Sequence, residues 1–220
     1  MLTQVKICGL CRPADAAMAV QAGADYVGVI CVPGHVRAQS REQAHAIFSA
    51  AGAARRVGVF VDAPESQVLD TADHLGLDIV QLHGAETIPF VVRVRESGRT
   101  VWKAIRPRTT EEYLAAVGRW SEIVDGLLID GWSAHAAGGT GARFDWYAVH
   151  GLRDRVPAGT AFIAAGGLRP DNVAEAVRLL QPDVVDVSSG VEASLCEKSA
   201  ARVQEFIEAV RSQAVLESFE

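Results

Sequence analysis

Cys8 and Asp130 combine reactive side chains with surroundings that suit acid–base chemistry. Asp130 directly follows the apolar run 126–129, and we expect these neighbours to desolvate its carboxyl group and raise its pKa. A carboxylic acid that stays protonated near neutral pH can act as a general acid. Cys8 ends the β-rich run 4–8, and its thiol is predicted to act as a general base or nucleophile.

Two segments rich in glycine and serine favour phosphate binding. Gly166 and Gly167 form one of them, and Ser189 and Gly190 belong to the other. Residues without bulky side chains let backbone N–H groups approach an anion closely. Either segment alone could be a tight turn, but together they predict a phosphate site.

Arg37 and His83 are further candidate contacts for a ligand. A guanidinium group can hold a carboxylate through two parallel hydrogen bonds, although a single arginine in a loop is most often a solvated surface group. His83 is a candidate substrate contact, and a histidine at a strand end is equally often a structural hydrogen-bond donor.

Cys8 and Cys11 form a Cys-x-x-Cys pair, which allows two other interpretations. A redox pair needs a thioredoxin-like context that this chain lacks. A zinc site needs two more ligands, for which Cys31 and His83 are the candidates, and there is no second Cys-x-x-Cys. We therefore expect no metal, and we expect the four cysteines, Cys196 included, to be reduced thiols.

Eight β-rich runs alternate with amphipathic stretches along the chain. The predicted strands are rich in Val and Ile with little alternation, which is typical of parallel strands buried on both faces. They cover residues 4–8, 26–30, 56–61, 79–82, 101–105, 126–130, 161–164 and 184–187. The predicted helices cover residues 13–22, 41–50, 64–75, 87–97, 110–117, 145–152, 170–180 and 198–212.

This alternation predicts an α/β fold, a single-domain (β/α)8 TIM barrel over residues 1–213 with a frayed tail at 214–220. A doubly wound open sheet would also alternate, but eight units without a long insertion favour closure. In such barrels the chemistry gathers where strands pass into the following loops, and phosphate commonly binds after the seventh and eighth strands. The candidate residues all follow strands in this way. The glycine-rich loop 131–143 is predicted to be a mobile lid.

Composition excludes several classes of protein. The formal net charge of −6 disfavours a nucleic-acid partner, and no apolar run is long enough to span a membrane. The first residues lack the pattern of a secretory signal, so we expect a cytoplasmic protein. A small phosphorylated molecule remains as the expected partner, with the chain acting as a monomer or a homodimer.

The motifs, taken in order, resemble those of phosphoribosylanthranilate isomerase. The resemblance extends from residue 5 to about residue 211, and the ordered set at matched spacing makes it specific. It rests on segments 6–10 (KICGL), 58–61 (GVFV), 80–84 (VQLHG), 138–141 (GGTG), 144–146 (FDW), 165–168 (AGGL) and 185–192 (VDVSSGVE). Cys11 departs from the pattern, since the family usually has Thr there.

The resemblance implies an Amadori rearrangement of N-(5′-phosphoribosyl)anthranilate in tryptophan biosynthesis, without a cofactor. In the family pattern Cys8 matches the general base and Asp130 the general acid. Arg37 matches the arginine that contacts the anthranilate carboxylate, and the two glycine loops match the loops that bind the phosphate.

Two other functions remain open at this point. One is a related or dual-specificity isomerase acting on the aminoimidazole substrate of the histidine pathway, whose family uses an aspartate where this chain has Cys8. The other is a catalytically idle barrel that binds a phosphorylated ligand. The retention of both Cys8 and Asp130 argues against the idle barrel.

Overall fold

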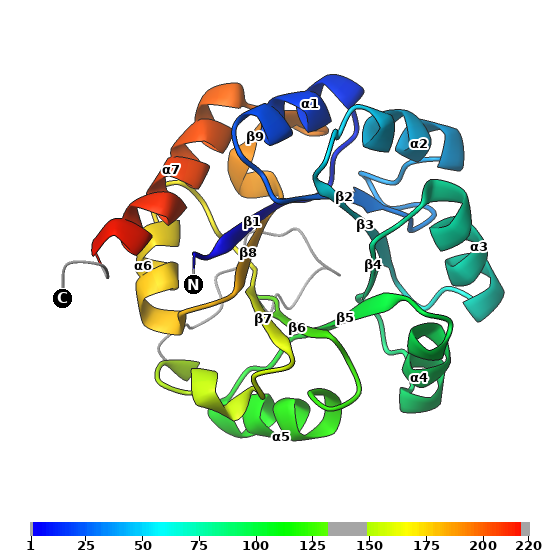
Figure 1. Cartoon of the computed structure of the whole chain (residues 1–220), viewed down its shortest axis with the longest axis vertical. Helices are drawn as coiled ribbons and strands as arrows, with labels where there is room; N and C mark the ends of the chain where they lie inside the picture. Colours follow the sequence, from blue (N-terminus) through cyan, green and yellow to red (C-terminus); the bar gives the residue numbers. More distant parts are fainter. Residues whose placement is uncertain (1, 132–148, 217–220) are drawn as a thin grey trace.

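A computed structural model of the chain describes residues 2–131 and 149–216. Eight parallel strands form a closed barrel in sequence order, and β1 closes it against β8 with Lys6 opposite Asp186 (Figure 1). This confirms the predicted fold class. The strands are β1 (Gln4–Ile7), β2 (Tyr26–Ile30), β3 (Arg55–Phe60), β4 (Ile79–Leu82), β5 (Thr100–Ile105), β6 (Gly126–Ile129), β7 (Ala161–Ala164) and β8 (Val184–Val187).

Helices surround the barrel as an outer ring (Figure 1). Local signals set several of their ends: Ser40 forms a capping box with Gln43, and Gly76 adopts the left-handed conformation with φ of 57°. In the described ranges no helix is long and apolar enough to cross a membrane. The helices are α1 (Pro13–Gln21), α2 (Arg41–Ser49), α3 (Glu65–Leu75), α4 (Ile88–Glu96), α5 (Thr110–Trp120), α6 (Val173–Leu180) and α7 (Ala200–Leu216).

Side chains of each strand alternate between two separate cores. In β5, Val101 and Ile105 pack outward beneath the helices, whereas Trp102 and Ala104 fill the barrel interior. The interior cluster is small and apolar in its lower part, where Trp102 lies against Tyr26 with ring centroids 5.1 Å apart. This alternation decides which residues can reach a site at the mouth of the barrel.

Every second side chain of a strand faces the barrel interior, and the candidate residues lie at such inward positions. In β1 the series runs through Gln4 and Lys6 to Cys8, and in β6 it runs through Leu128 to Asp130. Cys8 and Asp130 each follow the last strand residue, one position later than the strand proper. They therefore lie at the carboxyl ends of their strands and face the barrel axis.

Some predicted boundaries are wrong. Residues 150 and 151 form a turn rather than the end of an α-helix, and residue 152 leads into the short 3₁₀ helix η2 (Arg153–Arg155). Helix α6 begins at Val173 instead of residue 170, and α7 begins at residue 200 and continues beyond 212 to residue 216.

The segment after β8 has more structure than the sequence indicates. A 3₁₀ turn, η3 (Ser189–Val191), leads into the antiparallel hairpin of β9 (Glu192–Ser194) and β10 (Glu197–Lys198). Lys198, predicted to begin the last helix, instead ends this hairpin. Residues 132–143 of the predicted lid, 145–148 of the predicted helix and 217–220 of the predicted tail lie outside the described residues.

Candidate active site

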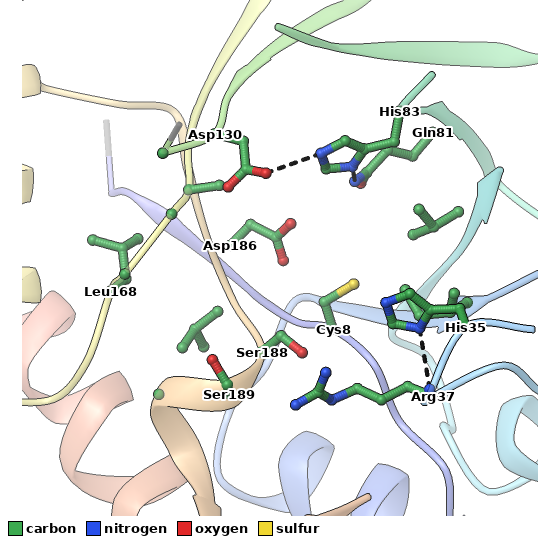
Figure 2. A pocket seen from close by; sticks show the side chains of 18 of the residues that line it. Cys8, His35, Arg37, Gln81, His83, Asp130, Leu168, Asp186, Ser188 and Ser189 are labelled. Carbon is green, nitrogen blue, oxygen red and sulfur yellow. Dashed lines mark hydrogen bonds and ion pairs between the residues drawn. The ribbon is translucent and has the colours of Figure 1, made fainter. Parts of the chain in front are cut away.

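A cavity opens at the carboxyl ends of the strands, with about 900 Å³ of empty space that is partly open to solvent. It brings together all the site residues predicted from the sequence: Cys8, Arg37, His83, Asp130, Gly166, Gly167, Ser189 and Gly190 (Figure 2). Residues from distant parts of the chain thus share one site, as the closed barrel requires.

Asp130 lies on the cavity wall, where its carboxyl group contacts His83 and Arg106. Its Oδ2 lies 3.1 Å from Nε2 of His83 and accepts a hydrogen bond of 3.3 Å from Nε of Arg106. Burial raises the pKa of Asp130, but its contacts with His83 and Arg106 lower the pKa by more, so the net pKa lies below the usual value. The expectation of a raised pKa is therefore wrong for this structure.

Cys8 faces the same cavity with a buried thiol that is not disulfide-bonded. Burial raises the pKa of the Cys8 thiol, and the nearby Lys6 ammonium only partly offsets this effect. Gly28 on β2 leaves room for the side chains of Cys8 and Lys6, because a Cβ atom there would lie 2.9 Å from the Cys8 sulfur. Of the two candidate acid–base residues, Cys8 therefore holds a proton in the free protein and Asp130 does not.

Sequence reasoning missed a buried polar layer directly beneath the mouth. Nζ of Lys6, fully buried, donates to Oδ2 of Asp186 at 2.8 Å and to Oε1 of Gln81 at 2.9 Å. The other carboxylate oxygen of Asp186 is buried without a partner in the described structure, and Asp186 lines the cavity. The signal was present in the sequence: each of these residues lies two positions before a mouth residue of its own strand.

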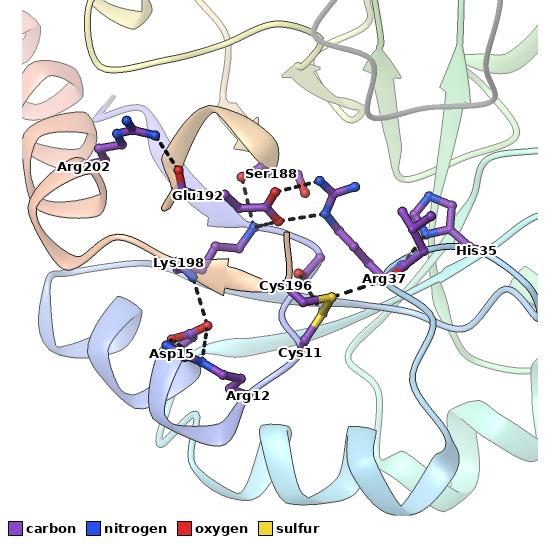
Figure 3. A network of polar contacts seen from close by, with 12 residues as sticks. Cys11, Arg12, Asp15, His35, Arg37, Ser188, Glu192, Cys196, Lys198 and Arg202 are labelled. Atoms are coloured by element: carbon purple, nitrogen blue, oxygen red, sulfur yellow. Dashed lines mark hydrogen bonds and ion pairs between the residues drawn. A yellow bond between two sulfur atoms is a disulfide. The ribbon is translucent and has the colours of Figure 1, made fainter. Parts of the chain in front are cut away.

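Arg37 reaches the cavity rim and is fixed there by an ion pair. Its Nε and Nη2 donate to the two carboxylate oxygens of Glu192 at 2.7 and 2.6 Å (Figure 3). Lys198 also donates to Glu192, at 3.2 Å, so two buried cations share one carboxylate. Burial raises the pKa of Glu192, but Arg37 and Lys198 outweigh it and hold the pKa below its usual value. Nη1 of Arg37 is not used by Glu192.

The two predicted phosphate loops pack against each other at the cavity. A Cβ atom on Gly190 would collide with the backbone carbonyl oxygen of Leu168, so a side chain does not fit there. Gly167 has φ of 69°, and its carbonyl oxygen accepts a hydrogen bond of 2.9 Å from Asn172. Glycine is therefore required by packing at one position and by backbone conformation at the other.

The cysteines do not follow the expectation of four reduced thiols. Cys11 is disulfide-bonded to Cys196, with Cα atoms 5.3 Å apart, and the bond joins the loop after β1 to the β9–β10 hairpin (Figure 3). Cys8 and Cys31 are free. With Cys11 bonded to Cys196, the zinc set considered above lacks one of its four ligands. Among residues 2–131 and 149–216 no group of three or more His, Cys, Asp or Glu side chains is arranged to hold a metal ion.

Comparisons with known proteins agree with this geometry. The family model for N-(5′-phosphoribosyl)anthranilate isomerase matches residues 5–209. Proteins of that name from Pelobacter propionicus and Rubrobacter xylanophilus are 41% and 40% identical to the chain; the alignments cover 94% and 96% of this chain and 94% and 100% of theirs.

Solved structures give the same result. The phosphoribosylanthranilate isomerase of Thermotoga maritima superimposes with a TM-score of 0.87 at 33% identity, covering 96% of this chain and all of that one. A phosphoribosylanthranilate isomerase in complex with reduced 1-(o-carboxyphenylamino)-1-deoxyribulose 5-phosphate superimposes with a TM-score of 0.84, also at 33% identity, and covers 96% of this chain and all of that one. The chain belongs to the N-(5′-phosphoribosyl)anthranilate isomerase family.

Proposed function

We propose that this protein catalyses the Amadori rearrangement of N-(5′-phosphoribosyl)anthranilate to 1-(2-carboxyphenylamino)-1-deoxy-D-ribulose 5-phosphate in tryptophan biosynthesis. Membership of the family is the general support. The observation that carries the proposal is the meeting of Cys8, Asp130 and both glycine loops on one cavity (Figure 2). These are the groups that an isomerisation by proton transfer on a phosphorylated sugar requires.

Asp130 is the proposed general acid and Cys8 the proposed general base. Protonation of the furanose ring oxygen by Asp130 opens the ring to an imine, and Cys8 then removes the proton from C2′ of the sugar. The two residues come from the ends of β6 and β1, so they can act on different sides of a bound sugar. A positioned acid–base pair can contribute about 10²- to 10⁴-fold in rate at each step.

Turnover needs the proton on Asp130 and not on Cys8, the reverse of the distribution favoured in the free protein. The substrate supplies part of the correction where its phosphate and carboxylate charges lie nearer to Asp130 than to Cys8, because a negative charge raises the pKa of both groups. The competent form is then a minor protonation state that the bound substrate makes more populated.

The two ends of the substrate have separate proposed partners. Arg37 is the proposed contact for the anthranilate carboxylate, with Glu192 holding the guanidinium group in place and Nη1 left for the ligand. Gly166, Gly167, Ser189 and Gly190 are the proposed phosphate grip. Fixing both ends holds the sugar between the acid and the base.

We further propose that the reaction needs no cofactor and that the protein works in the cytoplasm as a monomer or a homodimer. A similar structure, with a TM-score of 0.84, shows monomers generated from the dimeric phosphoribosylanthranilate isomerase of Thermotoga maritima, which supports both states for this fold. Light scattering across a range of protein concentrations distinguishes them.

The test is a fluorescence assay with freshly formed phosphoribosylanthranilate, whose fluorescence disappears on rearrangement. We expect the purified protein to turn over this substrate, and Cys8→Ala to lower kcat by about 10²- to 10⁴-fold with little change in KM. Cys31→Ala removes the other free thiol and is the matched control. Absence of activity would indicate an idle barrel, and a higher kcat/KM for the aminoimidazole substrate of the histidine pathway would favour that reaction instead.

A further inference from the structure

Four polar side chains form a continuous hydrogen-bonded chain from the barrel interior to the proposed acid. Nζ of Lys6 lies 2.9 Å from Oε1 of Gln81, and Nε2 of Gln81 lies 3.1 Å from Nδ1 of His83. Nε2 of His83 in turn lies 3.1 Å from Oδ2 of Asp130 (Figure 2). Lys6 and Gln81 are essentially inaccessible to solvent, so water does not compete for these contacts.

The chain has a direction that follows from which atoms can donate. An ammonium group only donates, so Lys6 fixes the amide oxygen of Gln81 on its own side. The amide nitrogen of Gln81 then faces His83 and donates to Nδ1, which must therefore carry no proton. The single proton of the imidazole lies on Nε2 and is donated to Asp130.

Lys6 is a permanent donor at the start of this chain. Burial lowers the pKa of Lys6, but the charge and hydrogen bond of Asp186, together with Cys8, outweigh it and keep the pKa above its usual value. The ammonium form therefore persists over the whole physiological range. The orientation of Gln81 consequently does not depend on solvent pH over that range.

Both described side-chain contacts of Asp130 fall on the same oxygen. His83 and Arg106 each donate to Oδ2, and Oδ1 receives neither bond. Two donors on one oxygen fix the plane of the carboxyl group and favour a proton on the other oxygen. The acid proton would then sit on Oδ1, the oxygen that His83 and Arg106 leave unbonded and that can meet the sugar.

We propose that Lys6, Gln81 and His83 are positioning residues that hold Oδ2 of Asp130 through a fixed Nε2–H tautomer of His83, leaving Oδ1 to deliver the proton. This inference rests on the proposed function, in which Asp130 is the acid. It assigns His83 a role different from that of a substrate contact or a proton carrier.

Paired substitutions of His83 separate these roles. Glutamine can place an amide N–H near the position of Nε2, whereas the shorter asparagine places it near Nδ1 and does not reach Asp130. We expect His83→Asn to lower kcat by about 10- to 100-fold with KM within about threefold of wild type. We expect His83→Gln to restore kcat to about tenfold or more above that of His83→Asn.

Two results would overturn the proposal. Equal loss of kcat in both variants would mean that His83 must titrate, as a proton carrier does. A large increase in KM in both, with kcat retained, would mean that His83 binds the substrate instead.

The tautomer provides a test that needs no substrate. In a ¹⁵N-edited NMR spectrum of the wild-type protein at neutral pH, we expect His83 to show protonated Nε2 and unprotonated Nδ1. Gln81→Met has a similar length but cannot hydrogen-bond, so it should give a mixture of tautomers. Gln21→Met, at the exposed end of α1, is the control for the substitution itself.

A proton on Nδ1 of wild-type His83 would refute the positioning chain even if the protein is an active isomerase. Conversely, an inactive wild-type protein with the expected tautomer would refute the proposed function while leaving the hydrogen-bonded chain in place. The two proposals therefore fail in distinguishable ways.

Discussion

Reduction of the Cys11–Cys196 disulfide should lower the stability of the protein considerably. The two residues are 185 positions apart, so the bond closes most of the chain into one loop in the unfolded state. The loop-entropy relation gives about 5 kcal/mol for a loop of this length, and measured disulfides usually contribute about 2–4 kcal/mol. We therefore expect the free energy of unfolding to fall by about 2–5 kcal/mol on reduction.

The assay is urea unfolding followed by tryptophan fluorescence, with and without dithiothreitol. A loss of this size moves the midpoint by roughly 1 M or more. Cys11→Ser should reproduce the reduced midpoint in both buffers, and Cys31→Ser should leave the difference intact. Thiol titration of the unfolded oxidised protein should find two reactive thiols among the four cysteines. Four reactive thiols in the oxidised preparation, or equal midpoints, would refute the reasoning.

Four further predictions concern residues of the site. Asp130→Asn keeps the shape but cannot release a proton, so kcat measured by substrate fluorescence should fall by about 10²- to 10⁴-fold with KM nearly unchanged. Because the pKa of Cys8 is raised above the ordinary thiol value of 9.0, thiolate absorbance at 240 nm attributable to Cys8, taken as the difference from Cys8→Ala, should appear only above about pH 9. Glu192→Gln loosens Arg37, and KM should rise about tenfold with kcat little changed. The pKa of Glu192 is lowered, so its contribution to stability is present above about pH 4.5 and lost as the pH falls; acid unfolding of Glu192→Gln should therefore depend less on pH in that range.

The strands and mouth residues could be predicted because their signals are local. A buried β-rich run followed by a polar or glycine residue marks the point where a strand passes into a loop, and this pattern placed Cys8 and Asp130 at the mouth. The helix predicted at 145–152 lacked comparable support, and its described end is a turn. The β9–β10 hairpin was missed because its strands have three and two residues, too few for a periodic pattern.

The electrostatic state of the site could not be predicted because it depends on contacts between strands. The sequence shows apolar residues before Asp130, and these alone would raise its pKa. His83 and Arg106 reverse the direction, and they come from the ends of β4 and β5, far away in the chain. The disulfide is a similar case, since nothing near Cys11 in the sequence indicates Cys196 as its partner.

The buried Lys6–Asp186 pair is better explained by the site than by stability. Moving two charges into a barrel interior costs several kcal/mol per ion, and their attraction often does no more than offset that cost. Apolar residues at these positions would extend the core of Trp102 and its neighbours without such a penalty. A stability argument therefore predicts their replacement. A positioning argument predicts their presence, because Lys6 supplies the fixed donor that orients Gln81 toward His83. The pairing of Lys6 with Oδ2 of Asp186 also leaves Oδ1 of Asp186 without a described partner beside the cavity.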